Sequence, residues 1–169
     1  MSAAVTSPIR PTAIGRWGAR VLRNRALMRA PIWLYRARLG FLFGSRTLML
    51  EHTGRKTGAR RYVVLEVIGH PAPGTYVITS GFGERAQWFR NLMASPRVRV
   101  SVAGQGPRPA TARRLPTAEA DAALADYVSR HPRAWAKFKT ILEHTLGTEV
   151  SEHRTPLPMV ELRLDRPRP

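Results

Sequence analysis

Cysteine is absent from the sequence. Without a thiol, no disulfide framework, iron–sulfur cluster or thiolate zinc site can form, and the composition suits a reducing compartment. The five histidines show no ligand spacing, so we predict that the chain holds no metal. With 169 residues, the chain is long enough to bury a core without crosslinks, and we expect one folded domain.

Acidic residues are scarce. Eleven Asp and Glu residues stand against 28 Lys and Arg residues, which gives a formal net charge of +17, and no acidic residue precedes Glu51. Such an excess of cations implies an acidic partner. Nucleic acid, an anionic membrane surface and a polyanionic small molecule all satisfy that description, and charge alone does not choose among them.

Long apolar runs are also missing. No stretch reaches the roughly 18 uncharged apolar residues that a spanning helix needs, so we expect no integral membrane segment. Residues 14–43 instead predict a basic amphipathic segment interrupted at Pro31. It packs either on the core of its own domain or in a membrane interface, and an organellar transit peptide is a less favoured third interpretation. We therefore expect a cytoplasmic protein that can lie on the inner membrane surface.

The rest of the chain alternates in the manner of short strands. Val98, Val100 and Val102, for example, alternate with Arg97, Arg99 and Ser101, as in a half-buried strand. The predicted strands cover residues 47–52, 62–68, 75–80, 98–102, 109–115 and 159–164, with a turn over 69–74. Helical spacing occurs over 86–94, over 118–130, and from Pro132 to a stop at Gly147.

These elements predict a mainly β fold of the α+β class. The short connections favour about six antiparallel strands, which points to a small β-barrel with peripheral helices. We divide the chain into a basic leader with helices over residues 1–46 and a barrel domain with C-terminal helices over residues 47–169. A Rossmann fold is excluded, because Gly81-Phe82-Gly83 lacks the third glycine and no βαβ unit surrounds it.

The most informative stretch is residues 53–61, which read TGRKTGARR between two predicted strands. Glycine allows backbone with φ > 0 and close approach to a ligand, while arginine offers a planar fork of donors for phosphate or carboxylate oxygens. The loop therefore suits a phosphorylated ligand. A solvated turn whose charges only keep the protein in solution is an equally open interpretation of this loop taken alone.

A second glycine loop and a helix follow in a specific order. The loop reads Ser80-Gly81-Phe82-Gly83, the helix contains Trp88-Phe89-Arg90-Asn91-Leu92, and Pro96-Arg97-Val98 comes next. Together with the basic loop, these motifs resemble the deazaflavin-dependent nitroreductase family. Its members are actinobacterial oxidoreductases with a split β-barrel related to the FMN-binding barrels. The resemblance runs in good register from about Leu39 to Val102 and more loosely to Leu164.

The resemblance implies that the chain is an oxidoreductase that uses coenzyme F420, a deazaflavin with a phosphodiester and a polyglutamate tail. The implied cofactor-binding residues are Arg55, Lys56, Thr57, Gly58, Arg60, Arg61, Ser80, Gly81, Phe82, Gly83, Trp88 and Asn91. A hydride would pass from the reduced cofactor to an activated double bond, a quinone or a nitro compound. FMN is a poorer substitute, because one phosphate would leave several loop cations unmatched. Related barrels often form homodimers.

Glu66 departs from the family pattern, because well-known nitro-reducing members carry an aromatic residue on this strand. This puts nitro reduction in doubt. A carboxyl there would donate a proton if its surroundings raised its pKa, so Glu66 is our one catalytic candidate, against the blander interpretation of an exposed or arginine-paired carboxylate.

Two rival functions are weighed against this one. A non-catalytic lipid- or flavin-binding barrel at the membrane surface would not need both loops. Nucleic-acid binding is suggested by the charge, but the sequence contains no recognised nucleic-acid motif.

Overall fold

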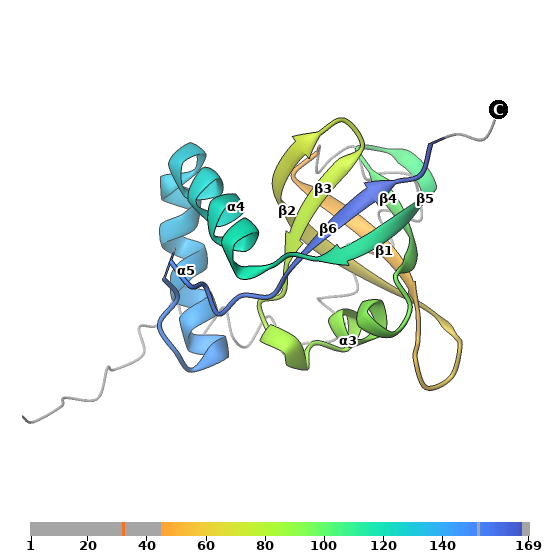
Figure 1. The fold of residues 1–169 in the computed structure, drawn as a ribbon, viewed down its shortest axis with the longest axis horizontal. Helices are drawn as coiled ribbons and strands as arrows, with labels where there is room; N and C mark the ends of the chain where they lie inside the picture. Colours follow the sequence, from red (N-terminus) through yellow and green to blue (C-terminus); the bar gives the residue numbers. More distant parts are fainter. Residues whose placement is uncertain (1–31, 33–44, 152, 167–169) are drawn as a thin grey trace, which may run out of the picture.

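The computed structural model describes residue 32, residues 45–151 and residues 153–166. Within them, six antiparallel strands form a closed barrel in the order β1-β2-β3-β6-β5-β4 (Figure 1). The strands are β1 (Thr47–Thr53), β2 (Arg60–Ala72), β3 (Thr75–Thr79), β4 (Arg97–Val102), β5 (Gln105–Arg114) and β6 (Met159–Leu164). The predicted small antiparallel barrel is confirmed. The predicted amphipathic segment over residues 14–43 lies outside the described residues, apart from Ile32.

Alternating side chains explain how the barrel closes. On β1, Leu48 and Leu50 are fully buried and stand opposite Val102 and Val100 of β4, in the pairing that joins the first strand to the fourth. Arg97 and Arg99, which alternate with Val98 and Val100, face outward and are exposed. Each fully buried apolar side chain contributes about 1.5–3 kcal/mol, so a strand with this pattern holds one face inward.

Strand β2 is longer than its sequence predicts. It has 13 residues and continues through the segment predicted as a turn, up to Ala72. The pairing with β3 shifts register on both sides of Gly69, which marks β-bulges that let the strand bend and go on. The turn itself shrinks to the two residues before β3, with Gly74 in the left-handed region at φ 73°.

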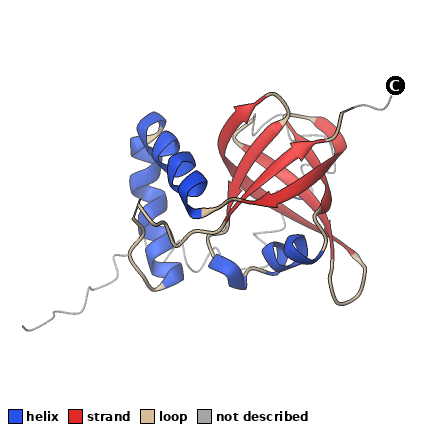
Figure 2. Cartoon of the chain, in the orientation of Figure 1, coloured by secondary structure: helices blue, strands red, loops and turns tan. Residues whose placement is uncertain are grey.

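In residues 45–151, three α-helices and a short 3₁₀ turn pack against one side and one end of the barrel (Figure 2). The turn η2 (Gly83–Arg85) and helix α3 (Gln87–Ala94) cover one end, and Phe89 and Leu92 of α3 join the barrel core. Helices α4 (Thr117–Arg130) and α5 (Pro132–Leu146) lie beside the barrel, over a second core shared with β2 and β3. In the described part of the chain, none of the helices is both long enough and apolar enough to cross a membrane.

Candidate functional site

The loop between β1 and β2 and the start of α3 meet at the same end of the barrel (Figure 1). Between them lies a cavity of about 820 Å³. Its lining comprises His52, Gly54, Arg55, Lys56, Thr57, Arg61, Tyr62, Val63, Phe82, Arg85, Ala86, Gln87, Trp88 and Asn91. The cavity therefore joins the two glycine-containing motifs that are far apart in the sequence.

The basic loop is shaped by its own backbone. The Gly54 amide donates to the Ala59 carbonyl at 2.8 Å, and the Gly58 amide donates to the Gly54 carbonyl at 2.8 Å. Gly58 has φ +68°, a conformation that side chains rarely adopt, and it does not line the cavity. The Thr57 hydroxyl accepts from the Ala59 amide at 3.3 Å. The glycines and Thr57 thus preform the loop that carries the cations.

Arg55 is anchored to α3 by amide oxygens. Its guanidinium donates to Asn91 Oδ1 at 2.9 Å and to Gln87 Oε1 at 3.0 Å, and its backbone amide donates to Asn91 Oδ1 at 3.2 Å. Both side-chain acceptors are neutral, so these contacts orient the guanidinium without cancelling its charge. Arg55 is a fixed cation at the cavity wall.

His52 is the last residue but one of β1, lies next to Asn91 and is only 5% exposed. Asn91 Nδ2 and His52 Nδ1 are 3.2 Å apart. Burial lowers the pKa of His52 to about 4, against the effect of a backbone hydrogen bond at Thr53, and the charge of Arg61 also lowers it. The imidazole is therefore neutral at pH 7, and its Nδ1 accepts the hydrogen bond from the Asn91 amide.

Three further cations line the cavity, namely Lys56, Arg61 and Arg85, and no Asp or Glu is among its described lining residues. Arg60 is not brought to the cavity, since its side chain is 72% exposed and lies 3.6 Å from the Glu51 carboxylate. The strand register explains the difference, because neighbours on a strand point to opposite faces.

The start of α3 adds a partial positive charge to the cavity. Ala86 stands at the N-cap and offers no side-chain acceptor, and the first turn contains no acidic residue. Ala86, Gln87 and Trp88 all line the cavity. The amide groups at a helix N-terminus favour anions, and here they act together with the cationic loop.

The second glycine loop lies mostly outside the cavity. The fully buried Ser80 donates its hydroxyl hydrogen to the Gly83 carbonyl at 2.7 Å, so its hydroxyl serves the loop. A Cβ on Gly81 would lie 3.1 Å from Leu142 of α5, which means that the glycine permits helix packing. Ser80, Gly81 and Gly83 do not line the cavity, whereas Phe82 does and is 41% exposed.

Trp88 is both core and cavity wall. Its side chain is 9% exposed, belongs to the barrel core and forms an edge contact with Phe89 at 6.0 Å between ring centroids. It also lines the cavity with Asn91, which the basic loop contacts directly. Trp88 therefore combines a place in the barrel core with a place in the cavity wall.

Glu66 lies away from the cavity. Its neighbours Leu65 and Val67 pack on the barrel core, while Glu66 accepts a hydrogen bond of 2.9 Å from the hydroxyl of Tyr127 on α4. Burial, with the nearby carboxylate, raises the pKa of Tyr127 to about 12, so the phenol keeps its proton and donates it. Glu66 thus anchors α4, and the geometry gives no support to a proton-donating role.

Sequence reasoning missed several lining residues, above all His52, Arg85 and Gln87. His52 carried a usable signal, because period-two alternation puts it on the same face of β1 as Leu48 and Leu50. Arg85 and Gln87 carried none, since only the docking of α3 brings them to the loop. Among the residues that the structure describes, no group of three His, Asp or Glu side chains could hold a metal ion.

Known structures resemble this fold at low sequence identity. One is an F420-H2 dependent reductase (FDR-A), with 23% identity over 70% of this chain and 94% of that one, at a TM-score of 0.49. Another, solved as a domain-swapped dimer, has 20% identity over 79% of this chain and 100% of that one, at 0.50. A protein of unknown function from Agrobacterium tumefaciens has 21% identity over 82% of this chain and 56% of that one, at 0.51.

The last two likenesses support the split-barrel fold and nothing further. No curated protein matches the sequence significantly. The profile of the F420H(2)-dependent quinone reductase family, by contrast, matches residues 27–159, a range that contains every residue lining the cavity. Because this match covers most of the sequence, the chain belongs to the F420H(2)-dependent quinone reductase family and is an F420-dependent reductase.

Proposed function

We propose that the chain transfers a hydride from F420H2, held in the cavity between the β1–β2 loop and α3, to a quinone. The observation that carries the proposal is the charge of the cavity. Four cations line it, Arg55, Lys56, Arg61 and Arg85, and its described lining contains no carboxylate. Such a site favours a ligand with several negative charges over a neutral one.

The donor set fits the cofactor that the family uses. Coenzyme F420 carries a phosphodiester and a polyglutamate tail, and both are anions that arginine and lysine bind through charge-assisted hydrogen bonds. Arg55 and Lys56 of the loop would hold this end, with the first amides of α3 beside them. Val63, Ala86 and Trp88 supply apolar surface for a planar ring. FMN, with one phosphate, would leave part of this charge unmatched.

The bound cofactor supplies a hydride from its C5 position, and the protein supplies binding, orientation and electrostatics. The cations hold the anionic end and so fix where the ring lies along the cavity. The apolar wall keeps water away from one side of the ring. Reduction of a quinone to a hydroquinone also consumes a proton, which we assign to water, since Glu66 lies elsewhere.

Phe82 supports a planar, apolar acceptor. It is the exposed aromatic side chain of the cavity lining, so its ring is available to a flat ligand in the cavity. A quinone ring presents the flat face that such a side chain can stack against. Nitro compounds and activated double bonds share this flatness, and a comparison of acceptors separates them from quinones.

The experiment has two stages. The protein is first titrated with oxidised F420, followed by fluorescence, beside FMN and a random oligonucleotide at near-physiological salt. Single-turnover mixing of the F420H2 complex with a quinone, a nitroaromatic and an enone then measures the rate of cofactor oxidation. Saturable binding of F420 alone and fastest oxidation by the quinone support the proposal. Binding without oxidation by any acceptor would leave a non-catalytic binding protein.

Two further expectations stay proposals. A homodimer is suggested by the similar structure solved as a domain-swapped dimer, and sedimentation velocity would test it. Association of residues 14–43 with an anionic membrane is tested by flotation with vesicles, for which a chain beginning at residue 47 is the control. The same truncation tests the proposed division into residues 1–46 and 47–169.

A further inference from the structure

We propose that His52 is a positioning residue for the bound anion: it sets the orientation of the Asn91 amide, which in turn holds Arg55 at the cavity. This inference rests on the proposed function, because it assigns the way in which the site prepares its principal cation. It adds a residue that the cationic motif of the sequence does not contain.

The geometry forms a chain of donors and acceptors across three elements. His52 of β1 accepts from Asn91 of α3, whose oxygen accepts two hydrogen bonds from Arg55 of the loop. His52 and Asn91 are each 5% exposed, so water has little access to replace either partner. A buried polar group that loses its partner is costly, which makes this arrangement the favoured one.

The acceptor on His52 and the donors of Arg55 require the same orientation of the Asn91 amide. If the Asn91 amide were flipped, its NH2 group would meet the guanidinium of Arg55, and two donors would face each other. An acceptor on His52 Nδ1 draws the NH2 group to the other side and leaves the oxygen for Arg55. His52 therefore acts on the ligand through Asn91 and Arg55, without touching the ligand itself.

Neutral acceptors suit the guanidinium of Arg55 better than carboxylates would. Arg113, elsewhere on the barrel, lies between Glu119 and Glu161 and is neutralised by them. Arg55 is held by the neutral amide oxygens of Asn91 and Gln87, so it keeps its whole charge for an incoming anion. A cation that is already oriented loses less conformational freedom when it binds, which raises affinity.

A double-mutant cycle tests the inference. F420 affinity is measured by fluorescence for His52→Leu in two backgrounds, the native chain and Arg55→Ala. We expect about tenfold weaker binding in the native background, because Arg55 is held less firmly and its charge-assisted contact with the anion is weakened. Little further loss is expected when Arg55 is already gone. His52→Gln, which can still offer an acceptor, should recover affinity to within about threefold of native.

Other results would overturn the inference. Equal losses in both backgrounds mean that His52 acts by general packing, and an unchanged affinity of His52→Leu means that it plays no part. Thermal melts accompany each variant, so that only folded proteins enter the cycle.

A measurement without ligand adds a second check. Nitrogen NMR of the imidazole should show the proton on Nε2, and a proton on Nδ1 would contradict the proposed acceptor. If the native chain binds no F420 at all, the proposed function fails on its own. The affinity of the same variants for inorganic pyrophosphate is then measured by calorimetry. If the effects of His52→Leu and Arg55→Ala on this affinity are simply additive, the inference is wrong independently of the proposed function.

Discussion

At the scale of the residue, neighbours decide what each cation of the basic loop can do. Arg55 is oriented by two neutral amide oxygens at the cavity, whereas Arg60 points to solvent beside Glu51. An ion pair whose guanidinium is largely in solvent is worth little, about 0–1 kcal/mol. Two arginines of one motif thus have different surroundings, and their substitution should have different effects.

Arg55→Ala should weaken F420 binding by roughly 10- to 100-fold, because one charge-assisted contact and the loop's anchor to α3 are lost together. Arg60→Ala is the matched control and should change the affinity by less than about twofold. Fluorescence titration of both variants at one salt concentration measures the difference. Similar losses for the two would mean that total charge, and not the cavity, binds the cofactor.

His52 should make stability depend on pH. Its pKa is about 4 in the folded chain and about 6.5 when unfolded, so the unfolded state binds the extra proton first. The stabilising contribution is complete above pH 6.5 and is lost as the pH falls towards 4. Between pH 7 and pH 5 we expect a loss of about 2 kcal/mol in the free energy of unfolding.

Urea denaturation at the two pH values measures this loss. The control is His52→Leu, in which the pH-dependent part assigned to this residue should be missing. A native chain and a variant with the same pH dependence would show that His52 titrates normally in the folded protein.

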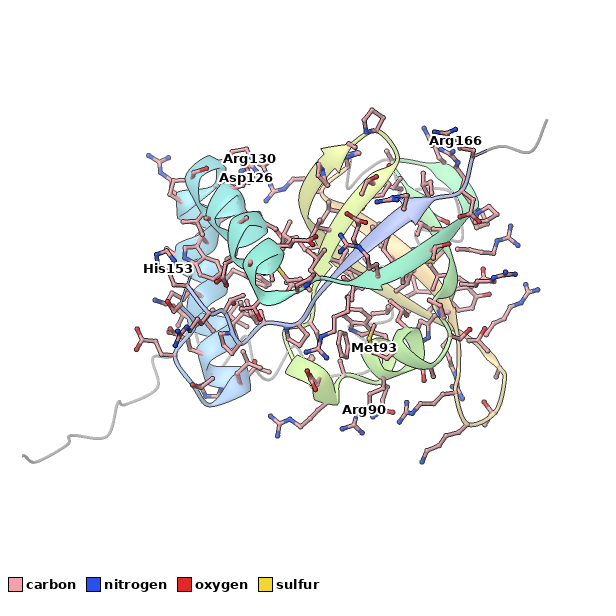
Figure 3. All side chains as sticks on the ribbon, in the orientation of Figure 1. Arg90, Met93, Asp126, Arg130, His153 and Arg166 are labelled. Atoms are coloured by element: carbon pink, nitrogen blue, oxygen red, sulfur yellow. The ribbon has the colours of Figure 1, made fainter. Side chains whose placement is uncertain are left out.

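Phe82 should govern the acceptor. Phe82→Ala removes the exposed ring at the cavity, so the KM for a quinone should rise by about tenfold with a smaller change in kcat. Met93 of α3 is also 41% exposed but does not line the cavity, which makes Met93→Ala a matched control (Figure 3). Steady-state kinetics with saturating F420H2 compares them. Equal KM values for native chain and Phe82→Ala would remove Phe82 from the acceptor site.

At the scale of the element, the second glycine loop serves packing. It leads from β3 to α3, and a Cβ on Gly81 or Gly83 would lie 3.1 Å from Leu142 or 3.3 Å from Leu146 of α5, closer than ordinary van der Waals contact. The short loop therefore packs closely against α5 and leads directly into α3. Any effect of this loop on the cavity passes through Phe82 and the start of α3.

Gly81→Ala should lower the free energy of unfolding by about 1–3 kcal/mol, because the added methyl would overlap Leu142 at 3.1 Å. Gly106→Ala on β5 is the control, since a Cβ there meets nothing within 4 Å. Chemical denaturation of both variants measures the difference. An undiminished stability of Gly81→Ala would mean that α5 yields easily at this contact.

At the scale of the whole molecule, the net charge of +17 shapes how anions arrive. Salt screens such a field within about 10 Å at 0.1 M ionic strength. F420 affinity should therefore fall several-fold between about 50 and 200 mM salt, and less steeply for the double variant Arg55→Ala and Lys56→Ala. Titrations at four salt concentrations give the two slopes. Equal slopes of affinity against salt for the native chain and the double variant would mean that the salt effect comes from the whole charged surface and not from Arg55 and Lys56.

Much of the fold follows from local pattern. The alternation of Val98, Val100 and Val102 predicts a strand with one buried face, and Gly147 ends α5 at φ 72° as expected from its position. The length of β2 does not follow, because the bulges beside Gly69 depend on pairing with β3. Bulges are set by the partner strand, and a single segment does not encode them fully.

The sequence by itself determined the strand and helix types, the barrel class and the cationic loop, because hydrophobic period, turn residues and charge are local properties. Only the tertiary structure decided which cations face the cavity, that Glu66 binds Tyr127, and that His52 meets Asn91. These are contacts between segments 39 and 61 residues apart. These contacts form only when distant elements pack together, and no local sequence pattern predicts that packing.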